Sequence, residues 1–402
     1  MAKAPKEDKH ERSAPGLTRR VQRTGSSSLS ITLPKSWTDS MNLQTGDVLR
    51  FRDLGEGRLE ISQANAEAPE ERRQRLLRID ATDVPANLLV RLLIGAYITG
   101  QDQVIVTTRG GLAPAQRQEI RRTVGHVLGM TVVEEDANGV EIQNFVDPGK
   151  YQLHRLLNQL VRMIRSELEA CQAALASGDR APLAQLPAIE DEVDRFYLLM
   201  VRQLLLSSDD FQVARDIGVE SHHYQIGYRL LAKTLELTGD LVAGVGRELN
   251  ESLPGLRRAP KSSLAEILAV LARFDRLLAQ TMDAFARLSP VDANATLNEI
   301  DRSLPADQGL GDALARRISD RHVAVAAQRI VSNIVMATEM LVIVNEVTIN
   351  RAVEPETVAK TDRQVGLHTM GAAEPPRRPP PVPPAPRDGR ATGGTVGKPG
   401  RL

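Results

Sequence analysis

The sequence predicts a multidomain α+β protein with a small β module, a βαβαββ middle domain and mostly α-helical three-helix bundles. Three observations predict it. Short runs with strand-like alternation fill positions 19–63, strand and helix patterns alternate over 76–147, and long helical patterns alone fill 151–354. At 402 residues the chain is longer than one ordinary core requires, so several domains are expected.

The amino-acid composition excludes several kinds of protein. The chain has 51 basic and 51 acidic residues, so any attraction to a polyanion must come from uneven placement of charge. A single cysteine, Cys171, excludes an internal disulfide framework and a cysteine-rich zinc module. The first 20 positions are charged and polar rather than apolar, so no secretory signal is visible. We therefore expect a cytoplasmic protein.

The N-terminal region begins with a basic arm. Between Lys3 and Arg23 seven basic residues face three acidic ones, which predicts a disordered segment over 1–18. The module over 19–63 follows, with alternation at 28–33, a short helix after Pro34 and a hairpin turn at 54–57. Because about 45 residues bury little surface, the module is expected to form a homodimer.

Basic and hydroxyl side chains in this module suit the backbone of double-stranded DNA. Cations can neutralise phosphates, and serine hydroxyls can donate hydrogen bonds to them. The candidate DNA-binding residues are Arg19, Arg20, Arg23, Ser26, Ser27, Ser28 and Lys35. The alternative is that the module only dimerises the protein and its basic strand faces solvent.

A polar linker over 64–75 precedes the mixed middle domain. Strand patterns at 76–79, 103–107, 131–135 and 140–143 alternate with helical patterns, which gives the order βαβαββ. Nothing in this domain resembles a phosphate-binding loop.

The rest of the chain is predicted to form two antiparallel helical bundles, over 151–254 and 260–354. Each bundle should contain about three helices, because turn residues interrupt the helical periodicity. The expected helices are 151–177, 188–206, 219–250, 262–288, 292–304 and 317–353. Positions 355–402 hold 10 of the 23 prolines and predict a disordered tail with local polyproline II structure.

One segment, 330–349, is apolar enough to raise the question of a membrane span. It contains Glu339 and Glu346, and two carboxylates within a span are costly in lipid. We therefore expect a buried bundle helix rather than an integral membrane protein.

Two pairs of acidic residues in the helical region are candidate metal ligands. Glu190 and Asp194 are four residues apart, as are Glu236 and Asp240 on the next long helix, so each pair shares a helix face. Like charges one turn apart repel, and a metal cation would relieve the repulsion. The alternative is that both pairs lie on solvated helix faces, which is common in a chain with 25% charged residues.

The N-terminal residues resemble a known DNA-binding family. The segment Arg20-Val21-Gln22-Arg23-Thr24-Gly25-Ser26-Ser27-Ser28-Leu29-Ser30-Ile31-Thr32-Leu33-Pro34-Lys35-Ser36-Trp37, followed by 43–48, is similar to the AbrB/SpoVT swapped-hairpin module. This resemblance implies a domain-swapped dimer that binds DNA.

The helical half resembles the PhoU domains of phosphate-uptake regulators over about 151–353. The resemblance is carried by 189–203 and 228–240 and implies that Glu190, Asp194, Glu236 and Asp240 bind a cluster of iron, zinc or similar ions. In the second bundle Gln328 and Ser332 stand where the acidic pair would be, so its site is expected to be lost.

These features together predict a non-enzymatic, phosphate-responsive DNA-binding regulator of phosphate uptake. The alternative is an adaptor that does not bind DNA and regulates a phosphate ABC transporter or a sensor kinase through its helical bundle. A di-metal phosphohydrolase is the least favoured reading, because no further base or nucleophile stands out beside the carboxylates.

Overall fold

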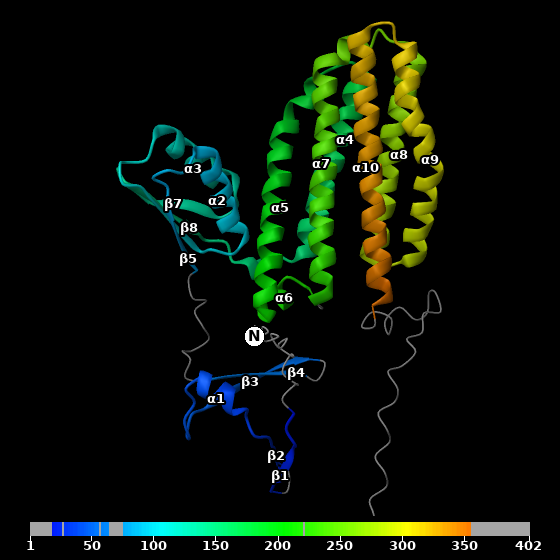
Figure 1. Ribbon diagram of the computed structural model, residues 1–402. Coiled ribbons are helices and arrows are strands. Elements are labelled where there is room, and N and C mark those ends of the chain that lie inside the picture. The colour runs from blue at the N-terminus through cyan, green and yellow to red at the C-terminus, as the bar shows by residue number, and fades with distance from the viewer. Residues whose placement is uncertain (1–17, 26–27, 56–57, 64–74, 220–221, 355–402) are drawn as a thin grey trace, which may run out of the picture. The chain divides into compact units, whose positions relative to one another are not determined.

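The structure, a computed structural model, describes residues 18–25, 28–55, 58–63, 75–219 and 222–354 (Figure 1). Most of the predicted arm, over 1–17, and the predicted tail, over 355–402, lie outside these residues. The chain divides into two compact units, one of residues up to 156 with 195–222, the other of 157–194 with 223 onward.

The N-terminal module consists of two separate antiparallel hairpins with a short helix between them. Strand β1 (Gln22–Thr24) pairs with β2 (Ser28–Ser30), and β3 (Leu49–Gly55) pairs with β4 (Arg58–Gln63). Helix α1 (Lys35–Ser40) follows Pro34, as the sequence predicted.

The described residues of this module do not form a buried core. None of the residues between 18 and 63 whose burial is described is buried. Several large apolar side chains are instead exposed to solvent in the single chain, among them Val21, Leu29, Ile31, Val48, Phe51 and Leu59. Apolar surface on this scale, on so small a unit, indicates that something else must cover it.

The mixed domain has the expected order of elements. These are β5 (Leu76–Asp80), α2 (Ala86–Ile98), β6 (Gln103–Thr107), α3 (Pro114–His126), β7 (Met130–Glu135) and β8 (Gly139–Asn144). The strands form one sheet in the order β5-β6-β8-β7, in which only β5 and β6 are parallel. Alternate strand residues such as Val104 and Val106 pack with Leu89 and Leu93 of α2 in a common core.

The second half of helix α5 (Leu186–Asp209) belongs to the same compact unit as this domain. Arg202 anchors it there with a guanidinium that is fully buried. Its Nη1 donates to the carbonyl oxygens of Tyr97 (2.6 Å) and Gln101 (3.0 Å), and its Nη2 donates to Asp102 Oδ1 (3.0 Å). The guanidinium also lies 5.2 Å from the centroid of the Tyr97 ring.

The other unit is built from long helices that run alongside one another (Figure 1). They are α4 (Leu153–Ser177), the first half of α5, α7 (His222–Leu256), α8 (Lys261–Arg287), α9 (Pro290–Arg317) and α10 (Arg321–Val353). Helix α10 packs against both α8 and α9. The short elements η1 (Pro148–Lys150), η2 (Ala181–Gln185) and α6 (Phe211–Asp216) lie in the connections.

Two predicted helix ends are wrong. Helix α7 continues through Pro254, and α9 continues through Pro305 to Arg317, although the sequence predicted only 292–304. A proline removes one backbone donor and disfavours a helix interior, but tertiary packing can offset that cost. Beyond Pro305, α9 is held by an ion pair between Asp307 and Arg273 of α8.

Helix α10 is the one described helix long and apolar enough to cross a membrane by length and composition. In its most apolar window 56% of the residues are buried inside the protein, and the core helix of a bundle passes the same test. Length and composition therefore do not distinguish a membrane span from a core helix at α10.

Replacing Arg202 with Ala should lower the free energy of unfolding by about 3–5 kcal/mol, because it removes one partner of a buried ion pair with Asp102 and two hydrogen bonds to the carbonyl oxygens of Tyr97 and Gln101. Urea unfolding followed by circular dichroism measures this change. Arg162→Ala on α4, an exposed arginine, is the control and should change stability by less than about 1 kcal/mol. Equal effects of the two variants would contradict the anchoring role of Arg202.

Candidate metal centre and DNA-binding module

The first hairpin of the N-terminal module turns at Gly25. Its φ of 83° lies in the left-handed region, which glycine adopts without steric cost. Across the hairpin Arg23 pairs with Leu29 and Thr24 pairs with Ser28, so Arg23 shares a face with an exposed apolar residue. On the other face, the Thr24 hydroxyl donates to Ser30 Oγ at 2.8 Å.

The predicted DNA-binding residues that the structure describes are all exposed. Arg19 and Arg20 precede β1, Arg23 lies in β1, Ser28 begins β2, and Lys35 begins α1. Ser26 and Ser27 lie outside the described residues. The five described residues are thus open to a ligand.

The acidic pairs are brought together where α7 approaches α5 and α4. Gly239 of α7 permits this approach, because a Cβ there would lie 3.2 Å from Val193 Cγ1 and 3.5 Å from Ile164 Cγ1. A larger side chain would push the helices apart. Gly239 lies between Glu236 and Asp240, so α7 packs closely against α5 and α4 at its acidic pair.

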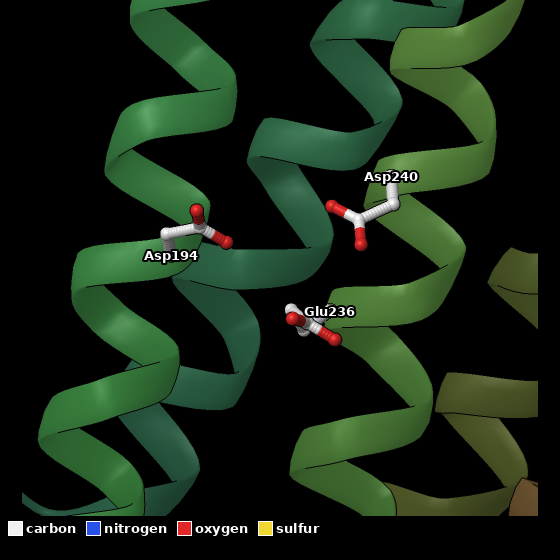
Figure 2. Close-up of side chains that lie close together, drawn as sticks. All are labelled: Asp194, Glu236 and Asp240. Atoms are coloured by element: carbon white, nitrogen blue, oxygen red, sulfur yellow. The ribbon is translucent and has the colours of Figure 1, made fainter. Parts of the chain in front are cut away.

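Three of the four predicted metal-binding carboxylates meet at this point. Asp194 of α5 and Glu236 and Asp240 of α7 point toward one another (Figure 2), and one oxygen of each lies within 4.8 Å of the others. Glu236 is buried, and both aspartates are partly buried. Three carboxylate oxygens at this spacing can serve as ligands to one metal ion.

Glu190, the fourth predicted ligand, is outside this group. Its two carboxylate oxygens accept hydrogen bonds from Arg247 Nη1 at 2.9 and 3.0 Å. Arg247 also donates to the backbone oxygen of Asp240 at 3.4 Å, and Lys233 pairs with Glu236. Cationic side chains therefore already offset part of the negative charge around the site.

The pKa of Asp240 is raised above its ordinary value. Burial is the main cause, and the neighbouring Glu236 carboxylate is the next. Both effects disfavour the charged form of Asp240, and a bound cation would offset them.

A further carboxyl group, Glu167 of α4, was missed by the sequence prediction. It is fully buried, and neither of its oxygens has a hydrogen-bond partner among the described residues. Its pKa is raised to about 8, first by burial and then by the charges of Glu190 and Asp240. The signal was available in the sequence, since Glu167 lies three residues after Ile164 and four before Cys171, on the apolar face of α4.

In the second bundle the corresponding positions are neutral. Gln328 donates to Asp312 at 3.3 Å, and Glu299 accepts a hydrogen bond from Arg276 at 2.7 Å. Within the part of the chain that the structure describes, Asp194, Glu236 and Asp240 form the one group of three or more side chains suited to hold a metal ion.

Comparison with known families identifies only the N-terminal module. Residues 22–71 match the family described as antidote-toxin recognition MazE, bacterial antitoxin. Searches of curated proteins and of solved structures each returned no match. The N-terminal module is therefore a MazE/AbrB-like domain, as its resemblance to swapped-hairpin proteins implied.

The metal-free protein should lose stability as pH rises, because the pKa of Glu167 is about 8 in the folded chain and 4.5 ordinarily. Between these values the folded state binds more protons than the unfolded state, so the Glu167 contribution is fully present below about pH 4.5 and is lost as pH rises through about 8. Thermal unfolding in chelator between pH 5 and 8 measures it.

The loss of stability with rising pH should be smaller in Glu167→Gln, which carries no titrating group at this position. Glu169→Gln, an exposed glutamate on the same helix, is the control and should follow the wild type. A Glu167→Gln profile that is superimposable on the wild-type profile would show that Glu167 does not titrate in this range.

Proposed function

We propose that this protein is a dimeric, non-enzymatic DNA-binding regulator that acts in the cytoplasm, with the helical unit as its sensory or partner-binding part. The observation that carries the proposal is an N-terminal module that matches the MazE antitoxin family and in which none of the residues whose burial is described is buried. A MazE/AbrB-like domain indicates a DNA-binding regulator that dimerises. A second copy of the module would cover the exposed apolar side chains of the first.

Dimerisation would also place the basic residues suitably for DNA. In one chain Arg19, Arg20 and Arg23 are exposed on or before a short strand that has few contacts of its own. Two such strands, brought together by two chains, would offer a positive surface to the phosphates of a duplex. The serines of the same hairpin would add hydrogen bonds that fix its position on the DNA.

The helical unit is proposed to hold a metal ion at Asp194, Glu236 and Asp240, with Glu190 beside them. The donors fit such an ion, because three carboxylate oxygens are close together and the group contains no histidine or cysteine. A donor set of this kind favours manganese, iron or magnesium over a thiolate-preferring ion. The ion would supply positive charge that links α5 to α7.

We further propose that the effector is phosphate status and that the regulated process is phosphate uptake. The support is the similarity of 189–203 and 228–240 to the signature helices of PhoU domains. A protein with the same helices but no DNA binding would instead act as an adaptor for a phosphate transporter or a sensor kinase.

Changing Arg20 and Arg23 together to Ala should weaken binding to a duplex from the protein's own upstream region, because phosphate contacts are lost. The log-log salt slope should fall by about 0.9 for each phosphate contact removed. A gel-shift series over several salt concentrations measures both effects. The matched control, Arg162→Ala with Arg258→Ala, removes two exposed arginines of the helical unit and should bind as the wild type does. Undiminished binding by the Arg20/Arg23 variant would favour the adaptor.

Changing Asp194 and Asp240 together to Asn should abolish metal uptake, because an amide oxygen carries no negative charge with which to hold the ion. Elemental analysis of the purified protein, after loading and gel filtration, measures the metal per chain. Asp191→Asn, an exposed aspartate on the same helix as Asp194, is the control and should retain the wild-type content. Equal metal content in all three proteins would remove the ligand assignment.

A further inference from the structure

Glu167 is a buried acid for which the fold provides no partner. Its exposed fraction is 0%, and both carboxyl oxygens lack a hydrogen-bond partner among the described residues. Burial of an unpaired carboxyl group is costly, so buried acids in proteins are normally hydrogen-bonded, ion-paired or bound to a metal. An unsatisfied acid at this position calls for a specific explanation.

The charged groups that act on Glu167 come from two neighbouring helices, α5 and α7. Glu190 on α5 and Asp240 on α7 both act on it with like charge, and Arg247 on α7 acts with opposite charge. Glu167 lies between Ile164 and Cys171 on the face of α4 that packs against α7. A Cβ at Gly239 of α7 would lie 3.5 Å from Ile164 Cγ1, and one at Gly246 would lie 3.6 Å from Cys171 Sγ. Glu167 therefore lies within the electrostatic field of the acidic group formed by α5 and α7.

Arg247 does not supply the missing partner. It binds both oxygens of Glu190 and the backbone oxygen of Asp240, and no hydrogen bond joins it to Glu167. Any other side chain that pairs with Glu167 would have to extend from α4, α5 or α7 to a fully buried carboxyl group. A bound ion meets this requirement without a side chain, because it is compact and can be approached by carboxylates from several helices at once.

We propose that Glu167 is an additional ligand of the carboxylate metal centre, contributed by the third helix of the bundle. This inference rests on the metal site proposed above and extends it from α5 and α7 to α4. The donors would then be carboxylates alone, a set that suits a hard or borderline divalent cation such as Mn²⁺ or Fe²⁺. The ion would connect three helices rather than two.

The test is isothermal titration of the full-length, chelator-treated protein with MnCl₂. Glu167→Gln should bind Mn²⁺ at least tenfold more weakly than the wild type, because it keeps the size of the side chain but loses its charge. Glu169→Gln on the exposed face of α4 should bind as the wild type does. Glu167→Asp, which keeps the carboxylate on a shorter side chain, should bind better than Glu167→Gln.

Thermal unfolding with and without Mn²⁺ separates a ligand from a structural residue. Without metal, Glu167→Gln should be at least as stable as the wild type, since a neutral amide is less costly to bury than a carboxylate. Addition of Mn²⁺ should raise the melting temperature of the wild type more than that of the variant.

The binding results separate the role of Glu167 as a ligand from the existence of the metal centre itself. Wild-type affinity in Glu167→Gln, with Mn²⁺ binding lost in the Asp194/Asp240 double variant, would overturn the role of Glu167 and leave the metal centre in place. A wild-type protein that takes up no Mn²⁺ or Fe²⁺ would overturn both. A metal-free Glu167→Gln protein that is unfolded would also overturn it, because the carboxyl would then be needed for the fold itself.

Discussion

The structure depends first on a hairpin module that cannot bury its own apolar side chains. Its two hairpins and one short helix leave Leu29, Ile31 and Phe51 exposed, and none of the described residues of this module is buried. A unit of this size gains too little from burial within one chain to offset the entropy of ordering it. A second copy is the partner that the MazE/AbrB-like character of the module indicates. The proposed DNA binding builds on that pairing, because two chains would place two copies of the basic strand side by side.

The helical unit presents a different constraint, which is negative charge placed where helices pack closely. Gly239 permits α7 to approach α5 and α4, and the same approach brings Asp194, Glu236 and Asp240 together. Arg247 and Lys233 offset part of this charge but do not contact Glu167 by a hydrogen bond. Helix α5 carries Asp194 in its first half and the buried Arg202 in its second half. A change in charge at the site would therefore act on a helix that is also fastened to the mixed domain.

Much of the fold was predictable because its signals are local. A glycine follows the last residue of α4, and a proline precedes the first residue of α1. In the mixed domain, the alternation of strand and helix patterns predicts the order of the elements. The paths of α7 and α9 through Pro254 and Pro305 were not predictable, because packing across helices offsets a local penalty there. The i, i+4 spacing identified the acidic pairs, but not that Glu190 would bind Arg247, which is 57 positions away. The sequence places Glu167 on the apolar face of α4. It was overlooked because, unlike the acidic pairs, it has no second acid four residues away on the same helix face.

The most direct test of the central claim is the mass of the full-length protein in solution, measured by sedimentation equilibrium beside a Phe51→Asp variant. Phe51 lies in β3 with a side chain that is 58% exposed in the single chain, so a charge there should harm only an interface between copies. The account predicts a wild-type mass twice that of the 44.0 kDa chain and a monomeric variant. A wild-type protein that remains monomeric at micromolar concentration, or a Phe51→Asp variant that stays dimeric, would contradict it.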